Sequence, residues 1–349
     1  MWSIYEVNNN LFHVAVFFII AGVCWKEDYS VGIKELKIFL KKKISSLYIP
    51  YVAWLSFFSL LHNFFLNINF YSDNELFMEG NLGNSFGLVY PYNVYDFLTS
   101  IVKNLLFLGN EPMAGASWFI RCLFGVIILW TTIDFILKKM FPNQIHILRL
   151  GISCFFMGIG NYLRIQGIYL PWNLSTVFSV YILFYCGVYY KATIDKIQNI
   201  FCFKRIYRII IIVLGAALLG MMNVLGKVEL SMNQYDGVIF LLVTSLLGWI
   251  FLIEIASIFN NAKIREVISI IGRNTLWILF LHFLVFKLVN ALQVILYGLP
   301  LYRIAAYPAL YTDKGWWIVY TIAGVFIPIY IKLIIRKVFK ALLNSKHTK

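Results

Sequence analysis

Nine long runs of apolar residues, separated by shorter polar stretches, dominate the pattern of the chain. They are Leu11–Trp25, Ile49–Leu66, Ser117–Leu137, Leu148–Tyr162, Leu174–Tyr190, Ile209–Val224, Gly237–Phe259, Thr275–Leu296 and Trp316–Ile335. A helix of about 17 to 25 residues crosses the hydrocarbon core of a bilayer. Lipid offers the backbone no hydrogen-bond partners, so such runs must be helical. The pattern predicts an all-α polytopic membrane protein, a bundle of about nine transmembrane helices forming a single integral-membrane domain over residues 1–349.

The amino-acid composition supports a membrane protein and argues against a soluble one. Apolar residues make up 61% of the chain and charged residues 13%, whereas soluble domains carry about 25% charged residues. The net charge of +14 would suggest nucleic-acid binding in a soluble protein. In a membrane protein it fits lysine and arginine residues that set topology, so we expect no nucleic-acid partner. The five cysteines contain no CxxC pair, and we expect neither a disulfide nor a metal site.

The basic residues are distributed unevenly between alternate loops. One set of loops, with the C-terminal tail, holds 23 of the 30 lysine and arginine residues, whereas the other set holds only Lys103, Arg164, Lys227, Arg303 and Lys314. Cytoplasmic loops are the ones enriched in lysine and arginine. The sequence therefore predicts a cytoplasmic C-terminus, and nine spans would place the N-terminus outside.

Three segments between the spans have either a functional or a purely structural interpretation. Val31–Lys43 predicts a basic amphipathic segment on the cytoplasmic side. It would either anchor the chain by extending its lysines to lipid phosphates or cradle an anionic cofactor such as coenzyme A. The outside loops Tyr71–Ala116 and Leu299–Gly315 would either shape a polar acceptor site or cap the bundle. Within the first of them, Phe97–Leu108 predicts a short interfacial helix.

Ionisable residues inside membrane spans are costly, and each is a candidate for function. Here they include His13, His62, Arg121, Glu254, His282 and Lys287. A histidine can act as a general base on a hydroxyl group, and an arginine can bind an anion or stabilise an oxyanion. The alternative for each histidine is a satisfied hydrogen bond to a neighbouring helix. The sequence contains no HxxxH, GxSxG, Walker or GxGxxG motif.

Five segments resemble, in order, a known family. FHVAVFFIIAG is similar to the FHMPLFFFLSG segment of the membrane-bound acyltransferase 3 family, which includes O-acetyltransferases of bacterial surface polysaccharides. Four further similarities follow along the chain: a basic segment leading into an LxPY-like helix start, a WFL-like helix, a Pw…lGyl.rk-like stretch and an iG..Sl.iyl.H-like helix. The five segments are Phe12–Gly22, Lys37–Tyr51, Ser117–Phe124, Leu170–Lys191 and Ile268–Val285.

The resemblance implies ten helices, one more than the pattern predicts. The additional helix of the family precedes the FHMP-like segment, carries an Arg or Lys and a His about ten residues later, and is implicated in catalysis. We expect this first helix to be missing here, as in a truncated, mis-started or inactive member. A tenth helix would return the N-terminus to the cytoplasm. Ala15 also stands where the family has proline.

The resemblance further implies an O-acyltransferase in the bacterial inner membrane. It would move an acyl group, most often acetyl, from acyl-CoA to a hydroxyl of a cell-surface glycan or lipid-linked sugar, as in exopolysaccharide biosynthesis. No cofactor would stay bound, since acyl-CoA is a substrate. His13 would lie near the acceptor, Arg121 would position an acyl or sugar oxygen, and His282 would support the polar core. The donor phosphates would be neutralised by Lys41, Lys42 and Lys43.

Two other classes of membrane protein remain open at this stage. A polysaccharide polymerase or flippase is also polytopic, basic and aromatic-rich, but commonly has about twelve spans. A small-molecule exporter would show Gly- or Pro-broken helices in matching halves of the chain, and no convincing internal repeat is visible. The pattern favours the acyltransferase.

Overall fold

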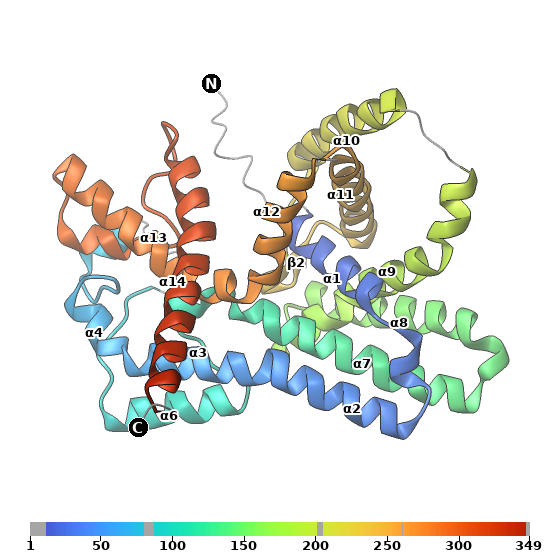
Figure 1. The fold of residues 1–349 in the computed structure, drawn as a ribbon, viewed down its shortest axis with the longest axis horizontal. Coiled ribbons are helices and arrows are strands. Elements are labelled where there is room, and N and C mark those ends of the chain that lie inside the picture. The colour runs from blue at the N-terminus through green and yellow to red at the C-terminus, as the bar shows by residue number, and fades with distance from the viewer. Residues whose placement is uncertain (1–11, 80–86, 201–204, 260, 347–349) are drawn as a thin grey trace. The chain divides into compact units, whose positions relative to one another are not determined.

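The computed structural model describes residues 12–79, 87–200, 205–259 and 261–346, which form two compact units. Described residues of Met1–Ile49 and Trp118–Ala262 make up the first unit, and those of Pro50–Ser117 and Lys263–Lys349 make up the second. Nearly every described element in both units is helical (Figure 1).

Among the described residues, the first unit contains seven α-helices and one small β-hairpin. Its helices are α1 (His13–Cys24), α2 (Ile33–Lys43), α7 (Trp118–Met140), α8 (Ile145–Ile165), α9 (Leu174–Ile200), α10 (Arg205–Leu225) and α11 (Val238–Ile258). Short helical turns occupy Glu27–Ser30, Ile44–Tyr48, Pro142–Gln144, Pro171–Asn173 and Leu230–Met232. The antiparallel strands β1 (Val228–Glu229) and β2 (Gln234–Tyr235) pair Val228 with Tyr235.

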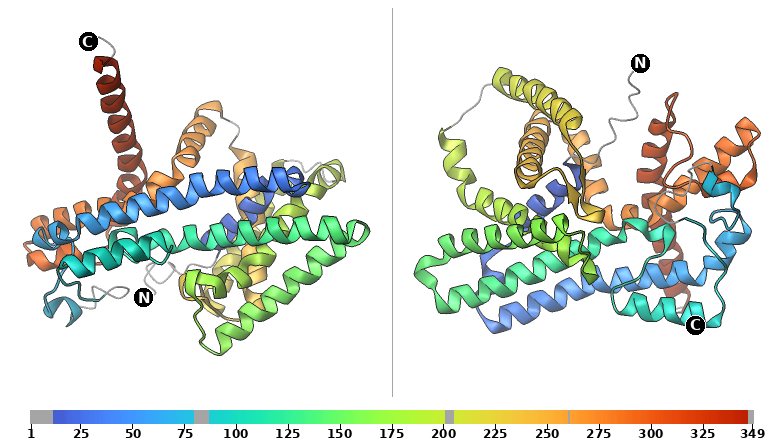
Figure 2. Two further views of the ribbon diagram at one scale, coloured as in Figure 1. Left: turned by 90° about the horizontal axis from the view of Figure 1, so that it is seen from below. Right: turned by 180° about the vertical axis from the view of Figure 1, so that it is seen from behind.

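Helix α9 is the centre of the first unit. It packs most extensively against α1 and α8, while α10 and α11 lie side by side, as Figures 1 and 2 show. In the most apolar stretch of α9, 61% of the residues are buried, compared with 11% in that of α10 and 22% in that of α11. The apolar surplus of the sequence is therefore divided between a core around α9 and helices that present their side chains outward.

The second unit is built around α13 and α14. Its helices are α3 (Ile49–Leu60), α4 (His62–Asn67), α5 (Leu76–Glu79), α6 (Val94–Leu105), α12 (Ala262–Arg273), α13 (Thr275–Tyr297) and α14 (Trp316–Lys346), with shorter turns at Pro112–Ser117 and Leu301–Ala305. Helix α13 packs against α14 (Figure 2) and against the turn Pro112–Ser117. Trp54 of α3 joins this core by packing on Trp277 and Phe280, with ring centroids 5.2 and 5.9 Å apart.

Six described helical segments are long and apolar enough to cross a membrane. They are Pro112–Met140, Pro171–Thr193, Ile206–Leu225, Val238–Ile258, Thr275–Tyr297 and Trp316–Val338. The prediction of an all-α polytopic membrane protein is thereby confirmed. The other three expected spans correspond to α1, which has 12 residues, to the pair α3 and α4, and to α8, which carries His146, Arg149 and Arg164.

The expected span Ile49–Leu66 is interrupted at Leu61, where φ is −90° and ψ is 2°. Helix α3 ends before this residue and α4 begins at His62. The break coincides with tertiary contacts, because the His62 side chain is held by Tyr90 and Glu111 of the loop Tyr71–Ala116. By contrast, the amphipathic helix predicted within Val31–Lys43 is confirmed as α2, and the predicted interfacial helix begins three residues early, as α6.

Candidate functional site

His13 is the first residue of α1 and its side chain is exposed. The preceding residue, Phe12, fixes this end of the helix: its ring occupies the space beside Gly248 of α11, and it makes an edge contact with Phe251 at 6.5 Å between centroids. A side chain at Gly248 would collide with the Phe12 ring. Glu229 of the β-hairpin lies close enough to interact electrostatically with His13. An imidazole with a carboxylate nearby is a suitable proton acceptor for a hydroxyl group.

The β-hairpin that supplies Glu229 is locked to α8 and α9. Asn233 adopts a left-handed conformation, with φ of 48°, at the turn of the hairpin. Its side chain accepts a hydrogen bond from Ser179 at 2.8 Å and donates one to the carbonyl oxygen of Gly160 at 3.3 Å. The guanidinium of Arg164 lies over the Tyr235 ring at 4.8 Å. The polar surroundings of His13 therefore rest on a rigid part of the first unit.

The other two predicted catalytic residues lie elsewhere. Arg121 is the fourth residue of α7, a half-buried position about one turn into the helix as expected, and α7 contacts α1. His282 belongs to the second unit, on α13. Its Nδ1 bonds the carbonyl oxygen of Ile278 at 3.0 Å, and its ring packs against Phe283 and Phe286. This hydrogen bond lies within α13, so it is not the hydrogen bond between helices that the structural alternative for His282 predicted.

The predicted donor-binding lysines lie at the end of α2. Lys41 and Lys42 are exposed, whereas Lys43 is half-buried with its ammonium over the Phe39 ring at 5.3 Å. Burial lowers the pKa of Lys43, and the neighbouring charge of Lys42 lowers it further. Phe39 is buried and stacks on Tyr29 at 4.3 Å. Helix α2 thus buries one apolar face and presents the charges of Lys41 and Lys42 to the solvent.

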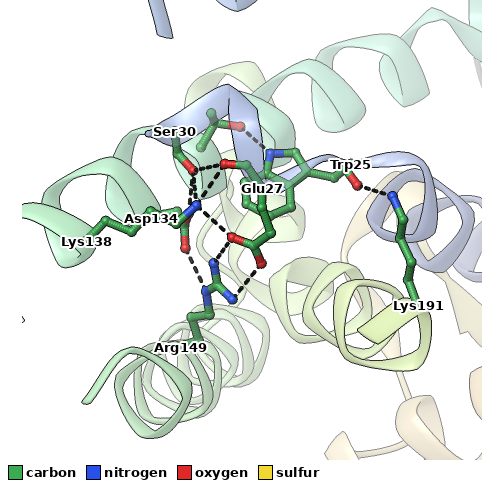
Figure 3. A network of polar contacts seen from close by, with 8 residues as sticks. Trp25, Glu27, Ser30, Asp134, Lys138, Arg149 and Lys191 are labelled. Atoms are coloured by element: carbon green, nitrogen blue, oxygen red, sulfur yellow. Dashed lines mark hydrogen bonds and ion pairs between the residues drawn. The ribbon is translucent and has the colours of Figure 1, made fainter. Parts of the chain in front are cut away.

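A partly buried ion network that we did not predict fixes the turn between α1 and α2 (Figure 3). The Arg149 guanidinium binds both carboxylate oxygens of Glu27, at 2.9 and 2.7 Å, and donates through Nε to Asp134 at 2.6 Å. Lys138 also reaches Glu27 at 2.6 Å and Asp134 at 3.2 Å. Ser30 donates to Asp134 at 2.6 Å. The two negative charges of the carboxylates and the two positive charges of Lys138 and Arg149 cancel in this network. Its central residue, Asp134, is 1% exposed.

Trp25 connects the same network to the core. Its indole N–H donates to Thr131 at 3.1 Å, and its carbonyl oxygen accepts from Lys191 at 2.7 Å. The cations of Lys138 and Arg149 lie over its ring at 5.4 and 5.7 Å. Asp134 lies inside an apolar span with Lys138 four residues later, and this was the sequence signal that could have revealed the network.

The second unit holds a buried pair formed by His62 and Glu111, of which Glu111 lies in the loop Tyr71–Ala116. His62 Nδ1 lies 3.2 Å from Glu111 Oε2, and His62 Nε2 lies 3.0 Å from the carbonyl oxygen of Tyr90. The hydroxyls of Tyr71 and Tyr92 donate to Glu111 at 3.4 and 2.9 Å. A carbonyl oxygen can only accept, so Nε2 carries the proton of its bond, and Nδ1 and Glu111 share another. Both ring nitrogens of His62 are therefore engaged in hydrogen bonds.

A family model described as an acyltransferase domain, that of acyltransferase 3, matches residues 2–338. The chain belongs to the acyltransferase 3 family. No curated protein and no solved structure matches the chain. The match covers residues of both compact units, and the resemblance inferred from five short segments is confirmed.

Membership in the acyltransferase 3 family makes the chain a membrane acyltransferase. Among the described residues, no group of three histidine, cysteine, aspartate or glutamate side chains could hold a metal ion. His13, whose side chain is exposed, lies in the segment Phe12–Gly22 that resembles the family's FHMP run.

Lys287, a further ionisable residue of α13, is buried and donates to the carbonyl oxygens of Ala305 and Ala306, both at 2.7 Å. One turn later, Asn290 donates to the carbonyl oxygens of Ile304 and Ala306, both at 2.9 Å. These side chains hold the backbone of the loop between α13 and α14. Of the two interpretations of the loop Leu299–Gly315, these contacts support a cap on the helices.

Proposed function

We propose that this acyltransferase 3 protein transfers an acyl group, in the first instance acetyl, from acyl-CoA to a hydroxyl of a cell-surface glycan or lipid-linked sugar. The observation that carries the proposal is the family match over residues 2–338. The hydroxyl oxygen attacks the thioester carbonyl carbon, the carbon–sulfur bond breaks, and the hydroxyl proton passes through a base to the departing thiolate. We further propose the bacterial inner membrane as its location, with a cytoplasmic C-terminus.

The placement of charges along α1 and α2 supports acyl-CoA as the donor. Coenzyme A carries phosphates at one end of a long pantetheine arm and the thioester at the other. Exposed Lys41 and Lys42 would hold the phosphates as point charges. Helix α1, with 12 residues, has a rise of about 18 Å between His13 and the turn that leads to α2. A long, flexible donor suits this separation.

His13 is the side chain that we assign to the acceptor hydroxyl. It is exposed at the end of α1, and the carboxylate of Glu229 would stabilise the imidazolium formed when the ring takes the proton. Arg121 would neutralise charge developing on the thioester oxygen. His282, hydrogen-bonded within α13, would act by holding the polar core rather than by touching substrate.

The test uses the full chain in lipid nanodiscs with radiolabelled acetyl-CoA and glycan from a producing strain. His13→Ala should lower kcat by about 10²- to 10⁴-fold, the usual contribution of a general base. Lys42→Ala should raise the KM for acetyl-CoA and leave the KM for glycan unchanged. His146→Ala and Lys139→Ala, which change exposed residues of α8 and α7, serve as matched controls.

Normal transfer by both His13→Ala and Lys42→Ala would contradict the assigned roles. The rival classes, a glycan flippase or polymerase and an exporter, are distinguished in proteoliposomes. Movement or polymerisation of substrate without release of CoA thiol would overturn the transferase proposal.

A further inference from the structure

Helix α6 in the second unit has an unusual distribution of side chains. Its apolar residues Val94, Leu98, Val102 and Leu105 are 53–77% exposed. Its polar residues at i, i+3, i+4 and i+7 instead line a cavity of about 510 Å³. Those four residues are Asp96, Thr99, Ser100 and Lys103. In a water-soluble protein the apolar stripe would point inward. Here the arrangement is reversed, as suits a helix lying at a membrane interface beside a polar chamber.

The opposite wall of the cavity is a rigid segment that includes Tyr90 and Tyr92. The Tyr92 ring stacks on His62 at 3.5 Å, with 6° between the planes. Asn63 clamps the Tyr92 backbone, donating to its carbonyl oxygen at 2.8 Å and accepting from its N–H at 2.7 Å. Glu111 accepts from the Tyr92 hydroxyl. The buried His62–Glu111 pair therefore acts as support for this wall.

The groups around the cavity match one class of ligand. They include one ammonium, one carboxylate, two side-chain hydroxyls and the amide of Asn110, together with tyrosine and proline residues. Ligand sites of this kind commonly enclose about 300–1,000 Å³ and contain a few convergent polar groups. A sugar ring offers many hydroxyls to polar side chains and C–H faces to apolar surfaces. In the described chain, neither Lys103 nor Asp96 is part of an ion pair.

We infer that this cavity binds a sugar unit of the glycan acceptor. Thr99, Ser100 and Asn110 hydrogen-bond its hydroxyls, and Lys103 binds a ring oxygen or an acidic substituent. The apolar face of α6 keeps the cavity at the membrane surface, where a lipid-linked or surface glycan is found. This inference rests on the proposed function, since it concerns the acceptor of the same reaction.

Direct binding is measured first, without any requirement for catalysis. The full chain in nanodiscs is titrated with methyl glycosides of glucose, galactose, N-acetylglucosamine and glucuronic acid, followed by saturation-transfer NMR. We expect at least one glycoside to bind. Thr99→Trp, which fills the cavity, should abolish this signal. Leu98→Trp adds the same side chain on the exposed face of α6 and should keep it. Lys103→Ala should weaken binding of the glucuronide about tenfold, since it removes a charged hydrogen-bond donor.

The transfer assay then separates the two proposals. An increase in the glycan KM of Thr99→Trp, with an unchanged KM for acetyl-CoA, supports the cavity as the acceptor site. If Thr99→Trp transfers acetyl with the wild-type KM for glycan, the cavity is not the acceptor site, and the proposed acyltransferase function is unaffected. Glycoside binding that depends on Thr99, without any transfer by the wild type, supports the cavity as a sugar site and overturns the proposed function. Absence of glycoside binding to the wild type, or equal binding to Thr99→Trp, overturns the inference.

Discussion

Alanine at Gly22 or Gly187 is the most direct perturbation of the helix that carries His13. Helices α1 and α9 approach each other at these two glycines, as small residues allow at helix interfaces in membranes. A Cβ atom on Gly22 would lie 2.1 Å from the carbonyl oxygen of Phe184, and one on Gly187 would lie 2.0 Å from that of Ile19. Both obstacles are main-chain atoms, which cannot turn away as a side chain can.

The size of the effect follows from these distances. Cβ contacts in real structures essentially never fall below 3.0 Å, so α1 must move from α9 by about 1 Å. A gap of 0.5–1 Å already removes about a quarter to a half of the van der Waals attraction of the atoms that face it. Overpacking of this kind costs about 1–3 kcal/mol. Alanine returns about 0.5–1 kcal/mol as a better helix former than glycine. We expect a net loss of about 0–2.5 kcal/mol for either substitution.

The measurement is equilibrium unfolding in mixed micelles with increasing dodecyl sulfate. Gly158→Ala on α8 and Gly220→Ala on α10 are matched controls, because a Cβ atom at either position meets nothing within 4 Å. These controls should be neutral or slightly stabilised. The Gly22→Ala/Gly187→Ala double variant should lose less than the sum of the two single losses, because the first substitution already opens the shared interface. Stability of Gly22→Ala equal to that of Gly158→Ala would refute the reasoning.

Three further predictions concern polar groups. Arg149→Met should cost roughly 3–5 kcal/mol because it leaves the buried Asp134 without its main partner, and Arg149→Met/Asp134→Leu should recover much of the loss in the same micelle titration. Burial alone would raise the pKa of Glu27, but hydrogen bonds from Arg149 and Lys138 lower it below 4.5 overall. The stabilising effect of Glu27 is therefore complete above pH 4.5 and is lost as the pH falls through the lowered pKa, so Glu27→Gln should show a flatter stability profile in acid. Asn290→Ala should remove the four hydrogen bonds of a fully buried side chain. We expect it to lower the free energy of unfolding by about 2–4 kcal/mol and to speed proteolysis of the loop after α13. An unchanged rate of cleavage would contradict the role of Asn290 in holding this loop.

Apolar runs located the helices well and their ends poorly, for a physical reason. The run predicted as Leu174–Tyr190 continues as helix to Ile200, through a stretch that alternates polar and apolar residues. Hydropathy reports the part of a helix that lipid or core surrounds, and it carries little information on turns that continue into water. Local chemistry would have improved one boundary: Asn93 and Asp96 form a capping box, which starts α6 at Val94 rather than at the predicted Phe97.

The polar partnerships were harder to predict than the helices. His62 was identified as an ionisable residue within a span, but its partner Glu111 lies 49 residues later in a loop. Glu27 and Arg149 are separated by 122 residues. No local pattern connects such pairs, because they meet only after the helices have packed. His13 was selected both as an ionisable residue of a span and by its place in the FHMP-like segment, and its catalytic role stays a prediction. The cavity beside α6 depends on which face of that helix points inward, and this was visible only in the structure.

The ion network at Glu27 bears on the proposal that Lys41 and Lys42 bind the donor. Lys138 and Arg149 are neutralised by Glu27 and Asp134, so they offer little net attraction to a phosphate. In the described chain, no carboxylate lies within ion-pair distance of Lys41 or Lys42, and both are exposed. Their attraction for phosphate is therefore screened by salt, whereas the buried bonds of Asp134 are screened much less. Rising salt should accordingly raise the KM for acyl-CoA at salt concentrations that leave the unfolding midpoint unchanged. If the affinity for acyl-CoA and the unfolding midpoint instead fall together, Lys41 and Lys42 act only through stability.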